Sequence, residues 1–216
     1  MLFSSRNSCG CFVCKFSNTV LYINVAKINP EKLYGNWTEG FALDVHTISS
    51  ELVGVDEKGN PSFETKRTEI GELLYRLKYK NDLTATAKIV ETATPFLEKW
   101  LSSKNIEIVI PAPSSATRQI QPVFLLAEQI GKALKINCRT DLLVKVSEGE
   151  SKNQDKAIEI KATGNANIPS NVLLIDDLFQ SGATLKACTK VLRETYKVNN
   201  IYVLCITKCK RSQVYF

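Results

Sequence analysis

The sequence predicts an α/β fold with a mostly parallel central sheet and helices on both of its faces. Three apolar segments have the length of short buried strands: IEIVI (106–110), NVLLI (171–175) and IYVLCI (201–206). Segments with helical periodicity separate them. Because strands that are covered on both faces are apolar throughout, this order of elements is typical of parallel strands joined by helices.

The composition indicates a globular protein without membrane segments. Of 216 residues, 44% are hydrophobic and 23% are charged, which excludes a disordered chain. No apolar run is long enough to span a bilayer, and the N-terminus lacks the apolar core of a signal peptide, so we expect a cytoplasmic protein. The formal net charge of +6 slightly favours anionic partners such as phosphates or nucleic acid, although ordinary solubility charge explains it equally well.

We divide the chain into an N-terminal part, residues 1–68, and a core, residues 69–216. Residues 1–40 carry cysteines and aromatic residues in no regular pattern. Residues 41–68 contain alternating and β-branched residues on either side of EKGNP, which is rich in turn formers. This part is therefore predicted to be an irregular cysteine-containing segment followed by a β-hairpin that forms a hood beside the core.

Helices are predicted where apolar residues recur at helical spacing. One such stripe predicts a helix that Thr68 can cap, and a second helix spans about 83–101, with Pro95 expected to kink or split it. Further helices are predicted from Pro122 and after the turn near residue 183, and the segment 141–146 is predicted to be a strand. The members of the first stripe are Ile70, Leu73, Leu74 and Leu77.

Two adjacent carboxylates follow the predicted strand 171–175. Because ligands bind outside the carboxyl ends of parallel strands, Asp176 and Asp177 are candidates for a binding site. An adjacent pair of acceptors suits the vicinal hydroxyls of a ribose. Ser181, Gly182 and Thr184 then lead into a helix, whose first N–H groups attract a phosphate. Together these residues predict a site for a ribose 5-phosphate that needs no Lys or Arg.

The acid pair also occurs in two other settings, a P-loop ATPase and a plain helix cap. P-loop ATPases also have an acidic residue after an apolar strand, but they require G-x-x-x-x-G-K-[ST] upstream. The Gly131-Lys132 pair is followed by Ala133, and position 126 is Leu, which excludes that motif. An Asp-Asp helix cap on an ordinary α/β domain is the second alternative, and the SGAT turn at this spacing disfavours it.

The stretch VLLIDDLFQSGAT (172–184) resembles the phosphoribosyl pyrophosphate (PRPP) signature of type I phosphoribosyltransferases. The resemblance implies the type I phosphoribosyltransferase fold, with Asp176 and Asp177 as the catalytic pair that holds the ribose hydroxyls. Acids at both positions argue against a degenerate, regulatory site. The resemblance also implies that the following turn holds the 5-phosphate through Gln180, Ser181, Gly182, Ala183 and Thr184.

Two further segments are similar to the ComF branch of that family. IEIVIPAPSSATRQIQPVFLLAEQI (106–130) has its Pro-x-Pro, Arg118 and the amide Gln121, although Pro122 stands where the pattern has a second amide. IGELLYRLKYKND (70–82) looks like the helix that precedes the core of ComF proteins. The loop after the first core strand should hold the pyrophosphate, with Arg118 as a bidentate partner or, alternatively, as a solvated surface charge. Its candidate residues are Pro111, Ala112, Pro113, Ser114 and Arg118.

The polar stretch 147–156 stands where the family carries a mobile lid that keeps water from the reaction. Lys152 and Gln154 are its candidate ligand contacts. Mg²⁺ is expected to chelate oxygens of the pyrophosphate and the ribose. Catalysis is then expected to consist of positioning and of charge stabilisation of the departing pyrophosphate.

The N-terminal cysteines suggest either a zinc site or free thiols. ComF-like proteins often begin with a zinc ribbon made of two Cys-x-x-Cys pairs, whereas this chain has one clear pair, Cys11 and Cys14, with Cys9 beside it. A structural zinc ion takes four ligands, and the lone histidine, His46, could be the fourth. His46 could equally lie in the hood near the acceptor base, or be a satisfied polar residue of the hairpin.

The resemblance implies a PRPP-dependent phosphoribosyltransferase that joins ribose 5-phosphate to a nitrogenous base or cleaves that bond. The alternative is a non-catalytic ComF-like adaptor that senses PRPP or a nucleotide, is linked to DNA uptake or processing, and binds a nucleic-acid or protein partner. No membrane partner is expected, and a homodimer is an open alternative. The acceptor base is not predicted, because the hood that would select it contains no interpretable motif.

Overall fold

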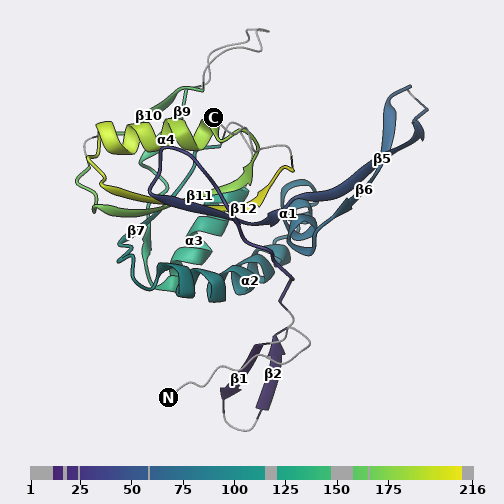
Figure 1. Cartoon of the computed structure of the whole chain (residues 1–216), viewed down its shortest axis with the longest axis horizontal. Coiled ribbons are helices and arrows are strands. Elements are labelled where there is room, and N and C mark those ends of the chain that lie inside the picture. Colours follow the sequence, from purple (N-terminus) through teal and green to yellow (C-terminus); the bar gives the residue numbers. More distant parts are fainter. Residues whose placement is uncertain are drawn as a thin grey trace.

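A six-stranded, mostly parallel sheet forms the centre of the protein (Figure 1). The computed structural model describes residues 12–16, 19–23, 25–57, 59–114, 121–146, 158–164 and 166–210, with side chains from residue 25 onward. The strands of the sheet are β3 (Glu31–Lys32), β4 (Glu39–Val45), β7 (Ile108–Pro111), β8 (Asn137–Cys138), β11 (Asn171–Phe179) and β12 (Asn200–Lys208). Their order is β3-β4-β12-β11-β7-β8, and only β3 pairs antiparallel. The predicted α/β class is confirmed.

Helices cover both faces of this sheet (Figure 1). On one face lie α1 (Glu69–Tyr79), α2 (Thr84–Leu101) and α3 (Pro122–Leu134), and on the other lies α4 (Ala183–Glu194). In β11, Leu173 and Ile175 pack on the α1–α3 face, whereas Val172 and Leu174 pack on the α4 face. All four side chains are fully buried, each stabilising the fold by about 1.5–3 kcal/mol. Successive side chains of a strand alternate between faces. Asp176 and Asp177, the next two residues, must therefore face opposite layers.

The helix capped by Thr68 forms as predicted, whereas Pro95 does not split α2. The Thr68 side chain accepts the Gly71 N–H at 3.1 Å and caps α1, which confirms the predicted cap. α2 is one helix through Pro95, so the proline does not divide it. The carbonyl of Glu91, which loses its helical donor to Pro95, belongs to an exposed residue that water can reach. In the described part of the chain, no helix is both long and apolar enough to cross a membrane.

The segment 141–146 contains the predicted strand, but the strand is shorter than predicted and lies outside the central sheet. Only β9 (Leu143–Lys145) is a strand, and it pairs antiparallel with β10 (Ile160–Ala162) in a separate two-stranded sheet on the α4 face. Val144 is exposed, so that only one side of β9 is buried, whereas a strand inside a covered parallel sheet needs two apolar sides. The edge position beside β7 is taken by β8 instead.

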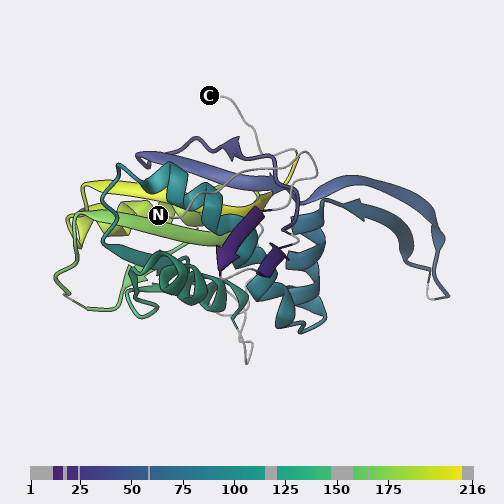
Figure 2. The same cartoon turned by 90° about the horizontal axis from the view of Figure 1, so that it is seen from below.

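A long β-hairpin projects from the body of the protein (Figures 1 and 2). It consists of β5 (Thr47–Val55) and β6 (Pro61–Arg67), and we call it the arm. In its turn, Asp56 Oδ1 accepts the Asn60 N–H at 2.8 Å, and Gly59 has a φ of 80°. The predicted hairpin around EKGNP is thereby confirmed, although β4, from the same predicted segment, joins the central sheet. A second hairpin is formed by β1 (Phe12–Phe16) and β2 (Thr19–Ile23).

Candidate functional site

A pocket of about 260 Å³ opens at the carboxyl ends of β7 and β11. Three segments that the sequence analysis singled out meet there: the loop after β7, the acid pair, and the turn before α4. Residues from these segments that line the pocket are Ala112, Pro113, Ser114, Asp176, Asp177, Gln180 and Thr184. The arrangement agrees with the general rule that ligands of open parallel sheets bind outside the carboxyl ends of the strands.

The pocket exists because β7 leaves the sheet before β11 ends. β11 pairs with β7 only as far as Ile175 opposite Pro111, and the Ala112 N–H still donates to the Ile175 carbonyl at 2.7 Å. Pro113 has no N–H with which to continue the ladder. On its other side β11 stays paired with β12 as far as Phe179. The acid pair therefore lies within the strand, in a part that is paired on one side only, rather than after a strand that ends at Ile175 as predicted.

Asp177 faces the α1 layer and forms an ion pair with Lys78. The Lys78 Nζ lies 3.0 Å from Oδ2 and 3.1 Å from Oδ1 of Asp177, and each side chain is 17% exposed. Lys78 comes from α1 and also lines the pocket. It was missed in the sequence, although it follows Leu74 by four residues and so lies beside the buried stripe of that helix.

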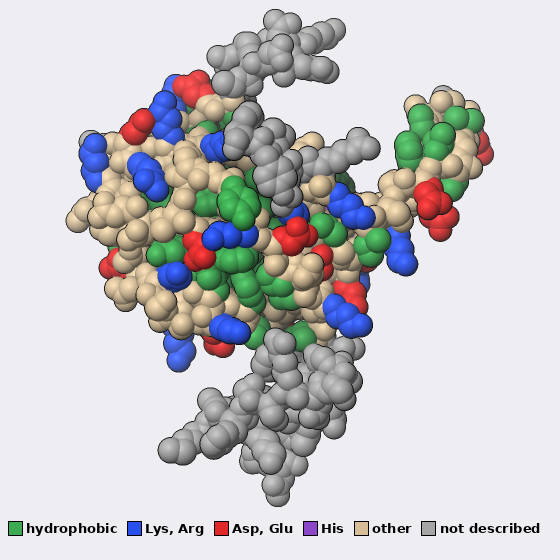
Figure 3. Space-filling view, in the orientation of Figure 1, with side chains coloured by type: hydrophobic (Ala, Val, Ile, Leu, Met, Phe, Trp, Pro, Cys, Tyr) green, Lys and Arg blue, Asp and Glu red, His purple; other side chains and the backbone are tan. Residues whose placement is uncertain are grey.

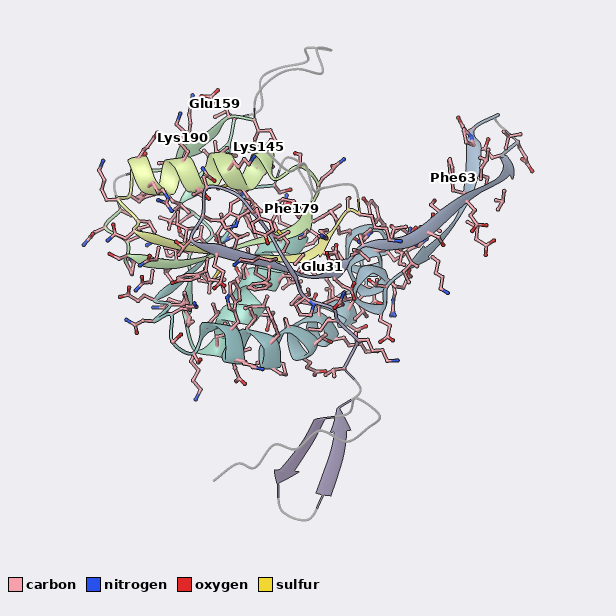
Figure 4. All side chains as sticks on the ribbon, in the orientation of Figure 1. Glu31, Phe63, Lys145, Glu159, Phe179 and Lys190 are labelled. Carbon is pink, nitrogen blue, oxygen red and sulfur yellow. The ribbon has the colours of Figure 1, made fainter. Side chains whose placement is uncertain are left out.

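Asp176 faces the opposite layer, where its carboxylate is largely removed from water. Its Oδ1 accepts the N–H of Asp177 at 2.8 Å. Burial, and after it the charge of Asp177, raise the pKa of Asp176 to about 7, against the weaker opposing effects of the Asp177 amide, Lys78 and Lys145. Lys145 of β9, labelled in Figure 4, lies on this α4 side of the sheet and is a second lysine of the pocket. Burial, and then the charge of Asp176, raise the pKa of the Cys188 thiol.

The turn before α4 requires a glycine at position 182. Gly182 has a φ of 75°, in the left-handed region, and a Cβ there would lie 2.8 Å from the ring of Phe179. α4 begins at the next residue, so its first N–H groups point into the turn, and the Ala183 N–H donates to Ser181 Oγ at 3.4 Å. Gln180 and Thr184 on either side line the pocket. The turn thus has the glycine and the helix N-terminus that the sequence indicated, and its binding of a phosphate stays a prediction.

Residues 33–37 support this turn from the side, which the sequence analysis did not foresee. The ring of Trp37 packs edge-on against Phe179 with centroids 6.3 Å apart, and its indole N–H donates to the Leu33 carbonyl at 3.1 Å. Asn36 donates to the carbonyl of Lys186 in α4 at 3.1 Å. Trp37 and Phe179 therefore fix the position of the backbone at Gly182.

His46 lies just beyond β4, close to the Lys78–Asp177 pair. Its Nδ1 is 3.1 Å from Thr207 Oγ1 of β12. Burial lowers the pKa of His46, and the charges of Arg67 and Lys78 lower it further, while Asp177 acts in the opposite direction. The imidazole is therefore neutral at neutral pH.

The described residues do not test the predicted zinc site. Cys9 and Cys11 lie outside these residues, and only the backbone of Cys14 is described. Within the described ranges, no cluster of three or more His, Cys, Asp or Glu side chains could hold a metal ion. Arg118 of the pyrophosphate loop and the lid residues Lys152 and Gln154 also lie outside the described residues.

Comparison with known proteins finds similar solved structures but no similar sequence. No protein-family model and no curated protein sequence matches the chain. Adenine phosphoribosyltransferase from Saccharomyces cerevisiae, solved with an imino-altritol bisphosphate and adenine, is 12% identical, with a TM-score of 0.47 over 74% of this chain and 85% of that chain.

Two other solved structures are similar to the chain to about the same degree. Adenine phosphoribosyltransferase from Giardia lamblia, solved with 9-deazaadenine, is 17% identical, with a TM-score of 0.45 over 74% of this chain and 81% of that chain. A hypoxanthine phosphoribosyltransferase from Staphylococcus aureus is 14% identical, with a TM-score of 0.44 over 61% of this chain and 68% of that chain. At such identities and TM-scores, a function for the chain has to be inferred from its own residues.

Proposed function

We propose that this chain is a PRPP-dependent phosphoribosyltransferase whose active site is the pocket between β7 and β11. The observation that carries the proposal is the meeting, in one pocket, of an adjacent acid pair, a glycine turn at a helix N-terminus and a Pro-x-Pro loop. Each part suits one portion of PRPP: the ribose, the 5-phosphate and the pyrophosphate. The resemblance of residues 172–184 to the PRPP signature supports the same assignment.

The 5-phosphate is assigned to the turn at residues 180–184. The turn contains no lysine or arginine, so the phosphate charge would be met by the first N–H groups of α4 and by the hydroxyls of Ser181 and Thr184. Gly182 allows the backbone to approach a ligand without a side chain in the way. Trp37 and Phe179 keep this backbone in place before the ligand arrives.

The ribose hydroxyls are assigned to Asp176 and Asp177. The two side chains point to opposite faces of the sheet, so each carboxylate would contact the sugar from a different face. Lys78 is the counter-charge of Asp177, whose carboxylate oxygens are hydrogen-bond acceptors for the sugar. Asp176, with its raised pKa, can exchange a proton near neutral pH at its carboxylate.

The pyrophosphate is assigned to residues 111–114, with Arg118 as its proposed charge partner. Lys78 and Lys145 line the same pocket and would add positive charge close to the leaving group. Mg²⁺ fits this donor set, because the carboxylate oxygens of Asp176 and Asp177 are hard ligands that suit it. When bound with PRPP, Mg²⁺ would neutralise part of the pyrophosphate charge.

A second candidate function is a sensor that binds PRPP or a nucleotide without turnover. The observation that favours it is the Lys78–Asp177 pair, in which both oxygens of one proposed ribose acceptor already hold a lysine. A ligand would have to share or displace this lysine, which is a means of coupling binding to the position of α1. The ComF-like adaptor linked to DNA uptake or processing belongs to this alternative.

Calorimetric titration with PRPP and Mg²⁺ tests the proposal. We expect binding by the wild type and at least a hundredfold weaker binding by Asp176→Asn/Asp177→Asn. Asp141→Asn is the matched control, because it removes one exposed carboxylate away from the pocket. Equal, negligible binding by wild type and double variant would refute a PRPP site. Binding by the wild type without pyrophosphate release across a panel of nitrogenous bases would select the sensor.

A zinc site at the N-terminus remains a separate proposal. His46 already engages Thr207 through Nδ1, which leaves Nε2 as its ligand atom toward Cys9, Cys11 and Cys14. Metal analysis of the purified protein tests this. Zinc well below one equivalent per chain would leave the cysteines as free thiols.

A further inference from the structure

The outer side of α4 carries a row of basic side chains. Lys186, Lys190 and Arg193 follow one another at intervals of four and three residues, so they share one face of the helix. Lys197 continues the row just after the helix ends, and all four residues are exposed. We call these four residues the basic stripe. Figure 4 labels Lys190 on α4, and Figure 3 shows Lys and Arg side chains over this part of the surface.

The basic stripe holds a large share of the net charge of the protein. Residues 183–197 contain four basic residues and one acidic residue, Glu194, so they contribute +3 to the formal net charge of +6. The segments beside α4 do not offset this charge. Segment 33–38, which is hydrogen-bonded to α4, contains no charged residue. In β10, which packs against α4, Lys161 pairs with Glu159 at 3.1 Å.

An ordinary solvated helix face has a different pattern of charge. Such faces usually mix both signs, because like charges three or four residues apart destabilise a helix. In α4, Lys190 has a basic neighbour at both of these spacings, Lys186 before it and Arg193 after it. The exposed charged side chains of α2 instead sum to zero, since they are Lys88, Glu91, Glu98 and Lys99.

The described part of the chain supplies no counter-charge to most of the basic stripe. None of its carboxylates forms an ion pair with Lys190, Arg193 or Lys197. The Lys197 Nζ donates instead to the backbone carbonyl of Glu194 at 2.8 Å. Because the charges of the basic stripe repel one another, an anionic partner would stabilise this surface.

The side chains around the basic stripe indicate what kind of anionic partner fits. A protein interface normally has an apolar centre, but the other exposed residues of 183–197 are Ala183, Glu194 and Thr195. Single-stranded nucleic acid is bound through successive bases stacked on aromatic rings. Tyr196 is buried, and Tyr34 in segment 33–38 is a single exposed ring. The surface therefore suits a partner that is recognised by its charges alone.

The spacing of the basic stripe agrees with that of a duplex backbone. A helix rises about 1.5 Å per residue, so Lys186 and Arg193 lie about 10 Å apart along α4. One strand of a DNA duplex carries a phosphate for about every 3.4 Å of its axis. Three phosphates thus occupy the length of helix that carries three cations.

We propose that the basic stripe of α4 binds the phosphate backbone of a nucleic-acid duplex without regard to base sequence. Lys186, Lys190 and Arg193 contact neighbouring phosphates of one strand, and the guanidinium of Arg193 can hold two phosphate oxygens. No base contact is involved, because no side chain suited to stacking stands on the stripe. The proposal stands whether or not the pocket at the acid pair binds PRPP.

Fluorescence anisotropy of a short labelled DNA duplex, titrated with the protein at several NaCl concentrations, tests this binding. Each phosphate contact releases counterions, so the logarithm of the association constant should fall with the logarithm of salt with a slope of about −3. Lys186→Gln/Lys190→Gln/Arg193→Gln is expected to bind roughly tenfold more weakly or worse at low salt, with a slope near zero. Circular dichroism checks that the variant is folded, which its exposed positions favour.

The matched control removes the same number of positive charges from the opposite face of the sheet. It replaces exposed lysines of α2 and α3, in the variant Lys88→Gln/Lys99→Gln/Lys132→Gln. Its duplex affinity should stay within about threefold of the wild type, because charges beyond a Debye length are screened. Asp176→Asn/Asp177→Asn should also keep its duplex binding, even where it loses PRPP, so the two proposals can fail separately.

Three results would overturn the proposal. The first is a wild type that does not bind the duplex at low salt, which would leave the basic stripe to an acidic protein. The second is an equal loss of affinity in the stripe variant and the α2–α3 control, which would make net charge the cause. The third is tighter binding of a single strand of the same sequence than of the duplex, which would mean that bases are contacted.

Discussion

The pocket at the acid pair and the arm depart from the usual distribution of residues in opposite ways. In the pocket, Asp176, Asp177 and Lys78 are partly withdrawn from water. In the arm, Leu52 and Phe63 are exposed to it. Ordinary folding free energy favours neither arrangement, since charge prefers water and apolar surface avoids it. A charged ligand would therefore stabilise the pocket, whereas an apolar surface would stabilise the arm.

The largest expected effect is at Asp177. Asp177→Asn removes a proposed ribose acceptor and also the counter-charge of Lys78, so we expect PRPP-dependent pyrophosphate release to fall roughly 10²–10³-fold. Steady-state assay of pyrophosphate release measures this, with Asp141→Asn as control. A loss below threefold in an active enzyme would show that Asp177 does not touch the substrate.

The next effect concerns the glycine turn. Gly182→Ala must place a methyl group against Phe179 in a left-handed backbone, so it should lower the free energy of unfolding by about 1–3 kcal/mol. Gly59→Ala in the arm has a similar φ but no atom within 4 Å of the added Cβ, and isolates the backbone contribution. Denaturant unfolding compares the two, and equal losses would show that the Phe179 contact is unimportant.

A smaller effect is the pH dependence that Asp176 imposes. Its pKa is raised in the folded protein from 3.8 to about 7, so between these values the folded state holds a proton that the unfolded chain has released. Stability is therefore lost as pH rises through this window. Asp176→Asn should leave the unfolding midpoint unchanged near pH 4 and raise it by about 3–6 °C at pH 8.

Thermal unfolding without ligand at a series of pH values measures this difference. Asp141→Asn provides a control of opposite sign, because Arg139 lowers the pKa of Asp141. A constant difference between Asp176→Asn and wild type at all pH values would contradict a raised pKa.

The smallest effect is expected in the arm. Leu52→Ala should change the free energy of unfolding of the chain by no more than about 0.5 kcal/mol, because the side chain is mostly exposed. Leu173→Ala in the centre of β11 should cost about 2–5 kcal/mol. Denaturant unfolding at low protein concentration compares them. A large loss at Leu52 would mean that the arm is packed within a single chain.

Local patterns in the sequence predicted much of the fold. The apolar runs at 106–110, 171–175 and 201–206 lie in β7, β11 and β12, because a strand covered on both faces needs such runs. The Thr68 cap and the turn of the arm were also predictable, since each depends on residues within five positions of one another. The separate pairing of β9 with β10 was not, because it depends on a partner beyond a long polar stretch.

The candidate site was predictable only in part. Asp176, Asp177 and Gly182 were identified because one continuous stretch contains them. Lys78 lies 99 residues from Asp177 in sequence, and their ion pair follows from the packing of α1 on the sheet. Trp37 reaches the turn in the same way, from a segment that precedes β4. Contacts of this kind depend on how layers pack, which no local pattern encodes.

Because β7 separates from β11 after Ile175, the two halves of β11 should differ in mobility. Between Val172 and Ile175, β11 is hydrogen-bonded on both sides, so its amides should exchange with solvent only when the whole protein unfolds. From Asp176 to Phe179 only β12 holds the strand, and amides there can exchange through local opening. The backbone that carries the two acids can thus adjust to a ligand while the core beside it stays closed.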